Sequence, residues 1–255
     1  MLRAIVSCLS VLVLCAFAVS CGGSSSTSTT QCTTGPFNIV GDWRGSFMNG
    51  TGSDSLVGVI SSSGKNAFVD NLADIAVFSS LTGTCSFTDT LSVYASQQSG
   101  TPGSASGAAQ GNVASAASFS GSSAVNNTNA TFNFATYTPI TTVAALSGNM
   151  TGTVEGPAGD LLTLALGGTS SNITFSGTDI GTSCAVNGTF VQEGTSNVYD
   201  VTYNIVAGGT CTAAALTGLG FESTSDLLNA NGGALGTYLY GIIPTATAPF
   251  VVEIH

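Results

Sequence analysis

The sequence predicts an all-β, antiparallel protein with two tandem small barrel- or sandwich-like halves that follow a signal peptide and a flexible tether. Two observations lead to this class. From Pro36 onward, short runs rich in Val, Ile, Phe, Thr and Tyr alternate with Gly, Asn, Asp and Ser, and no segment keeps the 3.6-residue apolar period of a helix. A weak internal repeat also divides the chain. Many short strands with Gly-rich turns are typical of antiparallel sandwiches and barrels.

Residues 1–20 have the pattern of an export signal. A charged start with Arg3 runs into an apolar stretch that is too short to span a membrane, and small residues precede Cys21. The segment resembles a bacterial lipoprotein lipobox, in which the Cys is acylated and becomes the new N-terminus, although Ala18 stands where Leu is usual. We expect lipidation of Cys21; the alternative is an ordinary signal peptide cleaved near Ser20.

Residues 21–35 are predicted to form a tether, because Gly, Ser and Thr offer too little apolar surface to order the chain. The first β half is assigned to residues 36–139 and the second to residues 140–255. The joint is placed near Pro139, since proline interrupts strand pairing.

The internal repeat has an offset of 107 residues. Residues 41–47 (Gly-Asp-Trp-Arg-Gly-Ser-Phe) align with residues 148–154 (Gly-Asn-Met-Thr-Gly-Thr-Val), and residues 67–69 align with 174–176. A downstream Cys follows in each half. This pattern favours a duplicated unit.

Alternating or apolar runs between turn residues mark the strands. The expected strands are residues 39–48, 55–60, 67–69, 85–94, 130–137, 149–154, 161–166, 172–176, 185–192, 198–206, 214–221 and 235–243. Between residues 96 and 128 the composition drifts to Ser, Ala, Gly and Asn, which suits either a flexible loop or weak edge strands. We expect irregular strands there, with a mobile loop near residues 100–107.

Four cysteines remain once the signal peptide and Cys21 are set aside, and an even number in an exported chain indicates disulfides. Three connectivities are possible. We favour the pairs Cys32–Cys85 and Cys184–Cys211, because each pair then falls within one of the two halves. Zinc is disfavoured, since these cysteines are far apart in sequence and no histidines accompany them.

The charge balance excludes nucleic acid as a partner. Without Arg3, only Arg44 and Lys65 oppose 13 carboxylates, so no basic patch can form. Attachment to a membrane would therefore depend on N-terminal acyl chains. Gly22 follows Cys21 where the enterobacterial pattern for inner-membrane retention has Asp, so we expect the outer membrane.

The chain lacks the residues of familiar catalytic sites. Its single histidine, His255, is the last residue and is expected to fray, so a Ser/His/Asp or Cys/His arrangement has no base. Residues 70–74 lack a complete Ca²⁺ loop and are expected to be a solvated turn. We predict no enzyme activity, no cofactor and no metal. A catalytic pair of carboxylates, as in glycoside hydrolysis, remains conceivable among Asp42, Asp54, Asp70, Asp74 and Asp89. Their spacing in the sequence selects no pair.

Several short elements together resemble a family of uncharacterised bacterial envelope lipoproteins. They are the Gly41-x-Trp43-x-Gly45 opening, residues 64–70, the Tyr137-x-Pro139 joint followed by residues 146–148, and the series Cys184, Asn197-Val198-Tyr199 and Cys211. The resemblance implies a two-part β architecture at the cell envelope and implies no activity. The Gly-x-Trp opening is also similar to that of lipocalins, but the Arg that packs over the Trp in lipocalins has no counterpart here.

Two functions follow as hypotheses. The first is a lipid-anchored cell-envelope protein with a non-catalytic structural or interaction role, supported by the anchor, the tether and the low charge. The second is a carrier that binds a small apolar ligand inside a β-barrel. An open interior volume of roughly 300 Å³ or more would favour the carrier. The protein or small-molecule partner is not specified by the sequence.

Overall fold

The computed structural model describes residues 35–50, 52–96, 103–137, 148–155, 160–225, 227, 235–245 and 250–255. Strands are the only long regular elements in these ranges. None of the described segments forms a helix with the length and apolar character needed to cross a bilayer.

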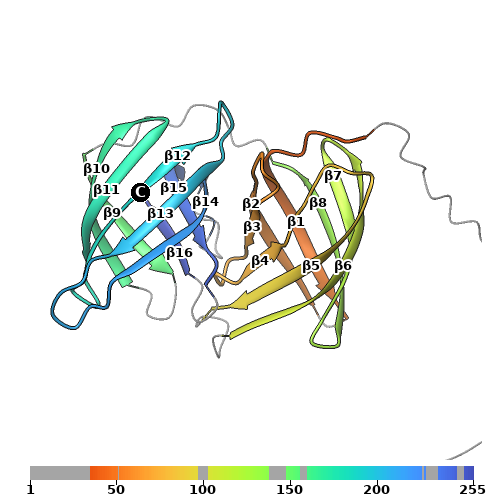
Figure 1. The fold of residues 1–255 in the computed structure, drawn as a ribbon, viewed down its shortest axis with the longest axis horizontal. Coiled ribbons are helices and arrows are strands. Elements are labelled where there is room, and N and C mark those ends of the chain that lie inside the picture. The colour runs from red at the N-terminus through yellow and green to blue at the C-terminus, as the bar shows by residue number, and fades with distance from the viewer. Residues whose placement is uncertain are drawn as a thin grey trace, which may run out of the picture. The chain divides into compact units, whose positions relative to one another are not determined.

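The first eight strands form a closed antiparallel barrel in which each strand pairs with the next and β8 pairs back to β1 (Figure 1). These strands are β1 (Gly41–Asn49), β2 (Gly52–Ile60), β3 (Asn66–Val69), β4 (Ile75–Phe78), β5 (Ser86–Ala95), β6 (Gly103–Ser115), β7 (Ser118–Val125) and β8 (Thr128–Thr136).

The other eight strands close in the same way, with β16 paired to β9. They are β9 (Gly148–Glu155), β10 (Asp160–Thr169), β11 (Asn172–Asp179), β12 (Ala185–Gln192), β13 (Tyr199–Ile205), β14 (Ala214–Ser225), β15 (Leu235–Ile243) and β16 (Phe250–Ile254). The prediction of an all-β protein with two tandem antiparallel halves is confirmed, and both halves are barrels. The expected boundary at residues 139 and 140 lies outside the described residues.

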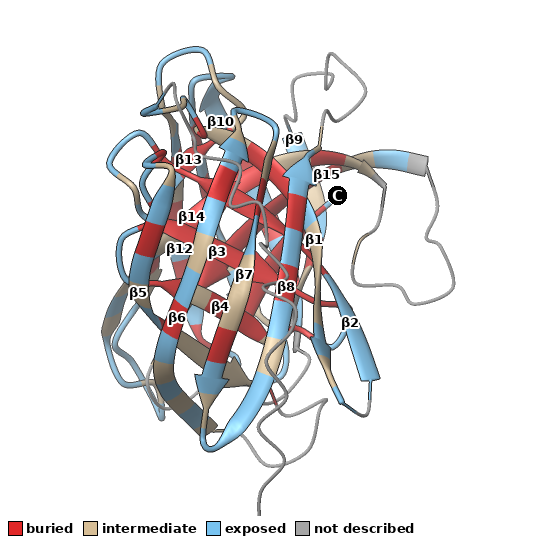
Figure 2. Cartoon of the chain, turned by 90° about the vertical axis from the view of Figure 1, so that its right-hand side faces the viewer, coloured by how far each residue is buried: buried red, intermediate tan, exposed pale blue. Residues whose placement is uncertain are grey.

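Strands are present where irregular strands are expected between residues 96 and 128, but the mobile loop expected near residues 100–107 is wrong from residue 103 onward. Residues 103–125 are neither a loop nor edge strands, because β6 and β7 are fully paired members of the first barrel. Their small inward residues make room for large neighbours: a Cβ on Gly111 would lie 2.7 Å from the Phe87 ring. In Figure 2, exposed segments alternate with intermediate and buried ones along β6, as expected for a strand with one face inside a barrel.

The residues of the internal repeat occupy equivalent places in the two barrels. Gly41 and Gly148 begin the first strand of each barrel with positive φ angles of 134° and 94°. Phe68 on β3 and Phe175 on β11 lie in the cores of the first and second barrels, respectively. The offset of 107 residues therefore relates corresponding strands, which supports duplication of one eight-stranded unit.

Aromatic rings fill one end of the first barrel. Trp43 is 1% exposed, its Nε1 donates a hydrogen bond to the Ile39 carbonyl at 2.9 Å, and its ring meets Phe119 edge-on at 4.9 Å. Phe119 also stacks on Phe134 with ring centroids 4.8 Å apart. This packing closes the barrel at the Trp43 end.

A third apolar cluster joins the walls of the two barrels. From the first barrel it contains side chains on the outer face of β2 to β4, including Val57, Val59 and Val69, and from the second it contains side chains of β14 to β16, including Phe221 and Tyr240. Residues 56–60 of β2 are consequently buried on both faces. Such strands carry continuous apolar runs instead of alternating ones.

Candidate ligand-binding cavity

A cavity of about 330 Å³ lies inside the first barrel, at the end away from Trp43. The strand register shows why its residues converge. Phe47 pairs with Asp54, and Val93 pairs with Ala105, so these side chains point to the interior with Leu56 and Leu91. The cavity is lined by Phe47, Asn49, Asp54, Leu56, Asp70, Asp74, Ile75, Ala76, Leu91, Val93, Ala105, Ser123, Val125, Asn126, Thr128 and Ala130.

The cavity exists because inward side chains become small at this end of the barrel. Phe78, Phe119 and Phe134 fill the interior near Trp43, whereas Ala76, Ala105, Ser123 and Ala130 line the other end. Eight strands enclose an interior that side chains can fill or that can hold one small ligand. The substitution of small residues at one end therefore leaves room for a ligand above an aromatic floor.

Three carboxylates line this cavity: Asp54, Asp70 and Asp74. Asp54 is on β2, while Asp70 and Asp74 bracket the turn between β3 and β4. Oδ1 of Asp70 accepts hydrogen bonds from the amides of Leu72 at 2.8 Å and Asp74 at 2.9 Å. Oδ1 of Asp74 accepts one from the amide of Ser96 at 2.6 Å. The turn thus fixes two of the carboxylates at the barrel mouth.

The pKa of Asp70 is raised to about 6: burial is the largest cause, the two backbone hydrogen bonds oppose it, and the charges of Asp74 and Asp54 add to it. Asp70 is 8% exposed. A carboxylate in this position costs free energy unless a counter-charge or further donors meet it. The mouth therefore carries negative charge that the described residues do not neutralise.

The other two carboxylates considered from the sequence lie elsewhere. Both oxygens of Asp89 are used outside the cavity: Oδ1 accepts from the Ser79 hydroxyl, and Oδ2 accepts from the Ser80 amide at 3.0 Å. Asp42 is buried where the barrels meet, and its Oδ2 accepts from Nδ2 of Asn197 at 2.9 Å. The structure thus brings together three of the five candidates, which the sequence spacing did not select.

Asp42 is an under-paired carboxylate. Its Oδ1 is buried without a hydrogen-bond partner among the described residues. Burial raises the pKa of Asp42 to about 7; the hydrogen bond from Asn197 lowers it, and the charge of Glu222 raises it. Because the folded pKa lies above the ordinary value of 3.8, stability from this group is complete below about pH 4 and is lost as pH rises through 7.

Replacing Asp42 by Asn is expected to stabilise the protein by about 1–3 kcal/mol at pH 8 and to have little effect near pH 4. Asn keeps an acceptor for Asn197 and removes the buried charge. Urea denaturation at several pH values measures this difference, with the exposed Asp200→Asn as the charge control. A gain that does not grow between pH 4 and pH 8 would contradict the assignment.

A second hollow, of about 580 Å³, follows the outer wall of the first barrel and is lined in part by Met48, Gln110, Ser122 and Thr131. Met48, Gln110 and Thr131 are exposed side chains that point away from the barrel core. We favour the interior cavity, because surrounding strands enclose its sides and give it an apolar floor.

In the described part of the chain, no group of three or more His, Cys, Asp or Glu side chains is placed to hold a metal ion. Residues 70–74 form the turn between β3 and β4, and its carboxylates are partly committed to backbone amides. His255 does not fray as expected. Its amide donates to the Thr151 carbonyl at 3.1 Å, and its Nδ1 lies 3.3 Å from Oε1 of Glu253.

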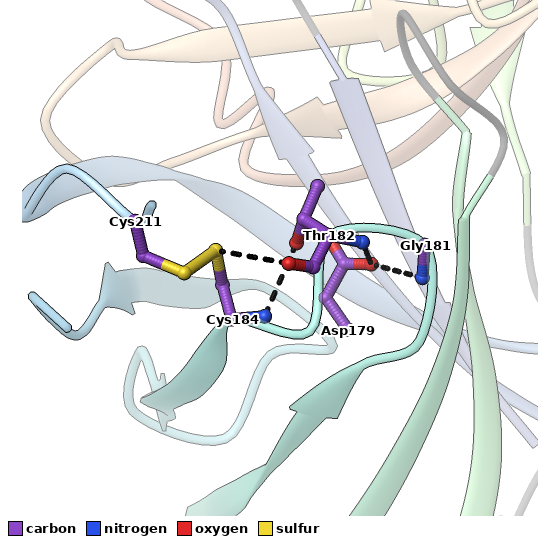
Figure 3. The surroundings of a disulfide bond; sticks show 5 residues. All are labelled: Asp179, Gly181, Thr182, Cys184 and Cys211. Atoms are coloured by element: carbon purple, nitrogen blue, oxygen red, sulfur yellow. Dashed lines mark hydrogen bonds between the residues drawn. A yellow bond between two sulfur atoms is a disulfide. The ribbon is translucent and has the colours of Figure 1, made fainter. Parts of the chain in front are cut away.

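The predicted disulfide between Cys184 and Cys211 is confirmed, with Cα atoms 5.7 Å apart (Figure 3). It joins the loop before β12 to the turn between β13 and β14. The loop is ordered locally, since Oδ1 of Asp179 accepts from the amides of Gly181 and Thr182 at 2.9 and 3.2 Å. Cys85 is also disulfide-bonded. Its expected partner Cys32, and the lipidation site Cys21, lie outside the described residues.

The fold and the cavity define an eight-stranded antiparallel barrel with an open apolar interior, joined to a second barrel of the same design. No protein-family model, curated protein or solved structure matches the chain.

Proposed function

We propose that this chain is a lipid-anchored protein of the bacterial outer membrane whose first barrel carries a small, largely apolar ligand. The observation that supports the carrier role is the cavity of about 330 Å³. Its volume falls in the range of small-molecule sites, about 300–1,000 Å³. Eight-stranded barrels such as lipocalins hold one small ligand in an interior of this kind.

The lining supports binding and gives no sign of catalysis. Phe47, Leu56, Leu91 and Val93 supply apolar surface, while the polar groups gather at the mouth. This arrangement desolvates a ligand body and leaves one end beside hydrogen-bonding groups, as in typical ligand sites. Among the described residues that line the cavity there is no His, Cys, Lys or Arg that could act with the carboxylates, which supports a non-catalytic role.

Binding is tested by native mass spectrometry of delipidated protein purified from its own host, and by calorimetry with n-octanol. We expect a co-purifying small molecule and saturable octanol binding. Ala105→Phe, which fills the cavity, should abolish both. Ala108→Phe is the matched control, because Ala108 lies on the same strand and faces outward.

If the wild-type protein binds no octanol and carries no small molecule, the carrier proposal fails and a structural or interaction role is favoured. Equal loss of binding in both Phe variants would also count against it, because the outward substitution should not reach the cavity.

Lipid anchoring is supported by the sequence around Cys21. Replacing Cys21 by Ala is expected to block acylation and to release the protein from the membrane or stall its processing. Fractionation of the native host and mass analysis of the N-terminus measure this. Normal processing with full membrane retention of the variant would disprove acyl anchoring.

A further inference from the structure

We propose that the cavity selects organic cations, namely amines with a short apolar body, whose ammonium group binds the carboxylates at the mouth. This inference rests on the proposed carrier function and names its ligand class. It combines the shape of the cavity with the charge of its rim.

The first step is the placement of the carboxylates. Asp54, Asp70 and Asp74 reach one cavity from β2 and from the two ends of the β3–β4 turn. The register places Asp54 opposite Phe47, so a carboxylate and an aromatic ring face the same interior. A ligand at the mouth would therefore meet negative charge directly beside an apolar wall.

Asp70 has one carboxylate oxygen, Oδ2, that accepts no hydrogen bond from a described residue. Asp70 is 8% exposed as a residue and lines the cavity. Its Oδ1 is occupied by the amides of Leu72 and Asp74. An accessible carboxylate oxygen at the wall of a cavity, without a donor among the described residues, is open to a hydrogen bond from a ligand.

No Lys or Arg side chain is among the described residues that line the cavity. In the described ranges the only Lys and Arg side chains are Arg44 and Lys65. The Arg44 guanidinium lies 4.7 Å from the centre of the Tyr137 ring, and Lys65 Nζ lies 3.7 Å from Oδ1 of Asp200. Neither lines the cavity. A bound cation would supply the missing charge.

The cavity suits an organic cation better than a metal ion. The three carboxylates are not arranged as a metal-binding group. An ammonium group needs only acceptors, because it has three donors and no acceptor. Burial of a hydrocarbon body against the apolar floor would add binding free energy, and a hydrated metal ion has no such body. The combination favours an amphiphilic amine.

The inference is tested by calorimetry at pH 8 and low salt with three probes of equal chain length: n-octylamine, n-octanol and octanoate. An alkylamine is protonated at this pH, as a Lys side chain is. We expect octylamine to bind about tenfold more tightly than octanol, and octanoate to bind least, because each ion interacts with the same carboxylates with opposite sign.

Asp54→Asn is the diagnostic variant, since Asp54 is exposed and the change should not disturb folding. It should weaken octylamine binding several-fold and leave octanol binding unchanged. Asp70→Asn keeps Oδ1 as an acceptor for the turn and should act in the same direction. Asp200→Asn removes an exposed carboxylate on the second barrel and should change neither affinity.

Octanol binding as tight as octylamine binding, or octylamine binding that Asp54→Asn leaves intact, would overturn the selection for amines while leaving the carrier function standing. Displacement of octylamine by Ca²⁺ at low millimolar concentration that K⁺ of equal ionic strength does not reproduce would indicate a metal site instead. Failure of all three probes to bind would reject the carrier function itself.

Discussion

Truncation of Trp43 to Ala is expected to lower the free energy of unfolding by about 3–5 kcal/mol. The side chain is 1% exposed and packs edge-on against Phe119 at the closed end of the first barrel. Its loss would leave a cavity and would also leave the Ile39 carbonyl without its donor. Urea or thermal denaturation of the wild type and the variant measures the difference.

The intrinsic fluorescence of the wild type provides a second readout, because Trp43 is the only tryptophan. Blue-shifted emission is expected for a buried ring. Trp43→Phe is the control: it retains most of the ring volume and should cost less than the Ala variant. Red-shifted emission, together with an Ala variant as stable as the wild type, would mean that Trp43 is exposed to solvent and accessible to a ligand.

Removal of the Cys184–Cys211 disulfide by replacing both cysteines with Ser is expected to cost about 3–4 kcal/mol in the chain-entropy model. The bond spans 27 residues and holds the loop before β12 against the turn after β13. Without it the unfolded chain gains loop entropy, so the second barrel should unfold at lower denaturant concentration. Denaturation with and without reductant measures the effect.

Non-reducing peptide mapping supplies the control for this prediction. A peptide that joins Cys184 to Cys211 is expected, and we predict another that joins Cys32 to Cys85. A peptide linking Cys85 to Cys184 would contradict both assignments. Unchanged stability in the double Ser variant would show that local contacts such as those of Asp179 hold the loop alone.

The sequence predicts strands well where large side chains alternate and poorly where small ones do. β12 and β15 coincide with the expected ranges of residues 185–192 and 235–243. For β6 the sequence predicts only an irregular strand with a mobile loop near residues 100–107, because Gly, Ala and Asn have low strand propensity. Its inward residues are small because Phe87 and its neighbours occupy the volume. That complementarity depends on closure of the barrel and cannot be read from one strand.

Two further strands, β4 and β16, were not predicted at all. Both are short, apolar and buried on nearly every residue, so neither shows the alternation used to find the other strands. Their outer faces pack where the two barrels meet. An unbroken apolar run was therefore a signal for a doubly buried strand.

The carboxylates of the cavity were visible in the sequence only as members of a larger set. Asp70 and Asp74 are close in sequence, but Asp54 joins them through the antiparallel pairing of β2 with β3. The cavity itself depends on which side chains point inward on several strands at once. Strand register decides this, and it was not predicted.

The contact between the barrels is head-to-tail in terms of the repeated unit, because one copy uses its second to fourth strands and the other its sixth to eighth. Such a contact could in principle add copies without end. The equivalent outer faces of the other strands differ in character. Thr163, Thr174 and Ser176 are exposed on β10 and β11, and Ser120 and Asn133 are exposed on β7 and β8. These faces also expose Leu161 and Val191, but their polar side chains distinguish them from the apolar faces of β2 to β4 and β14 to β16 that are buried between the barrels.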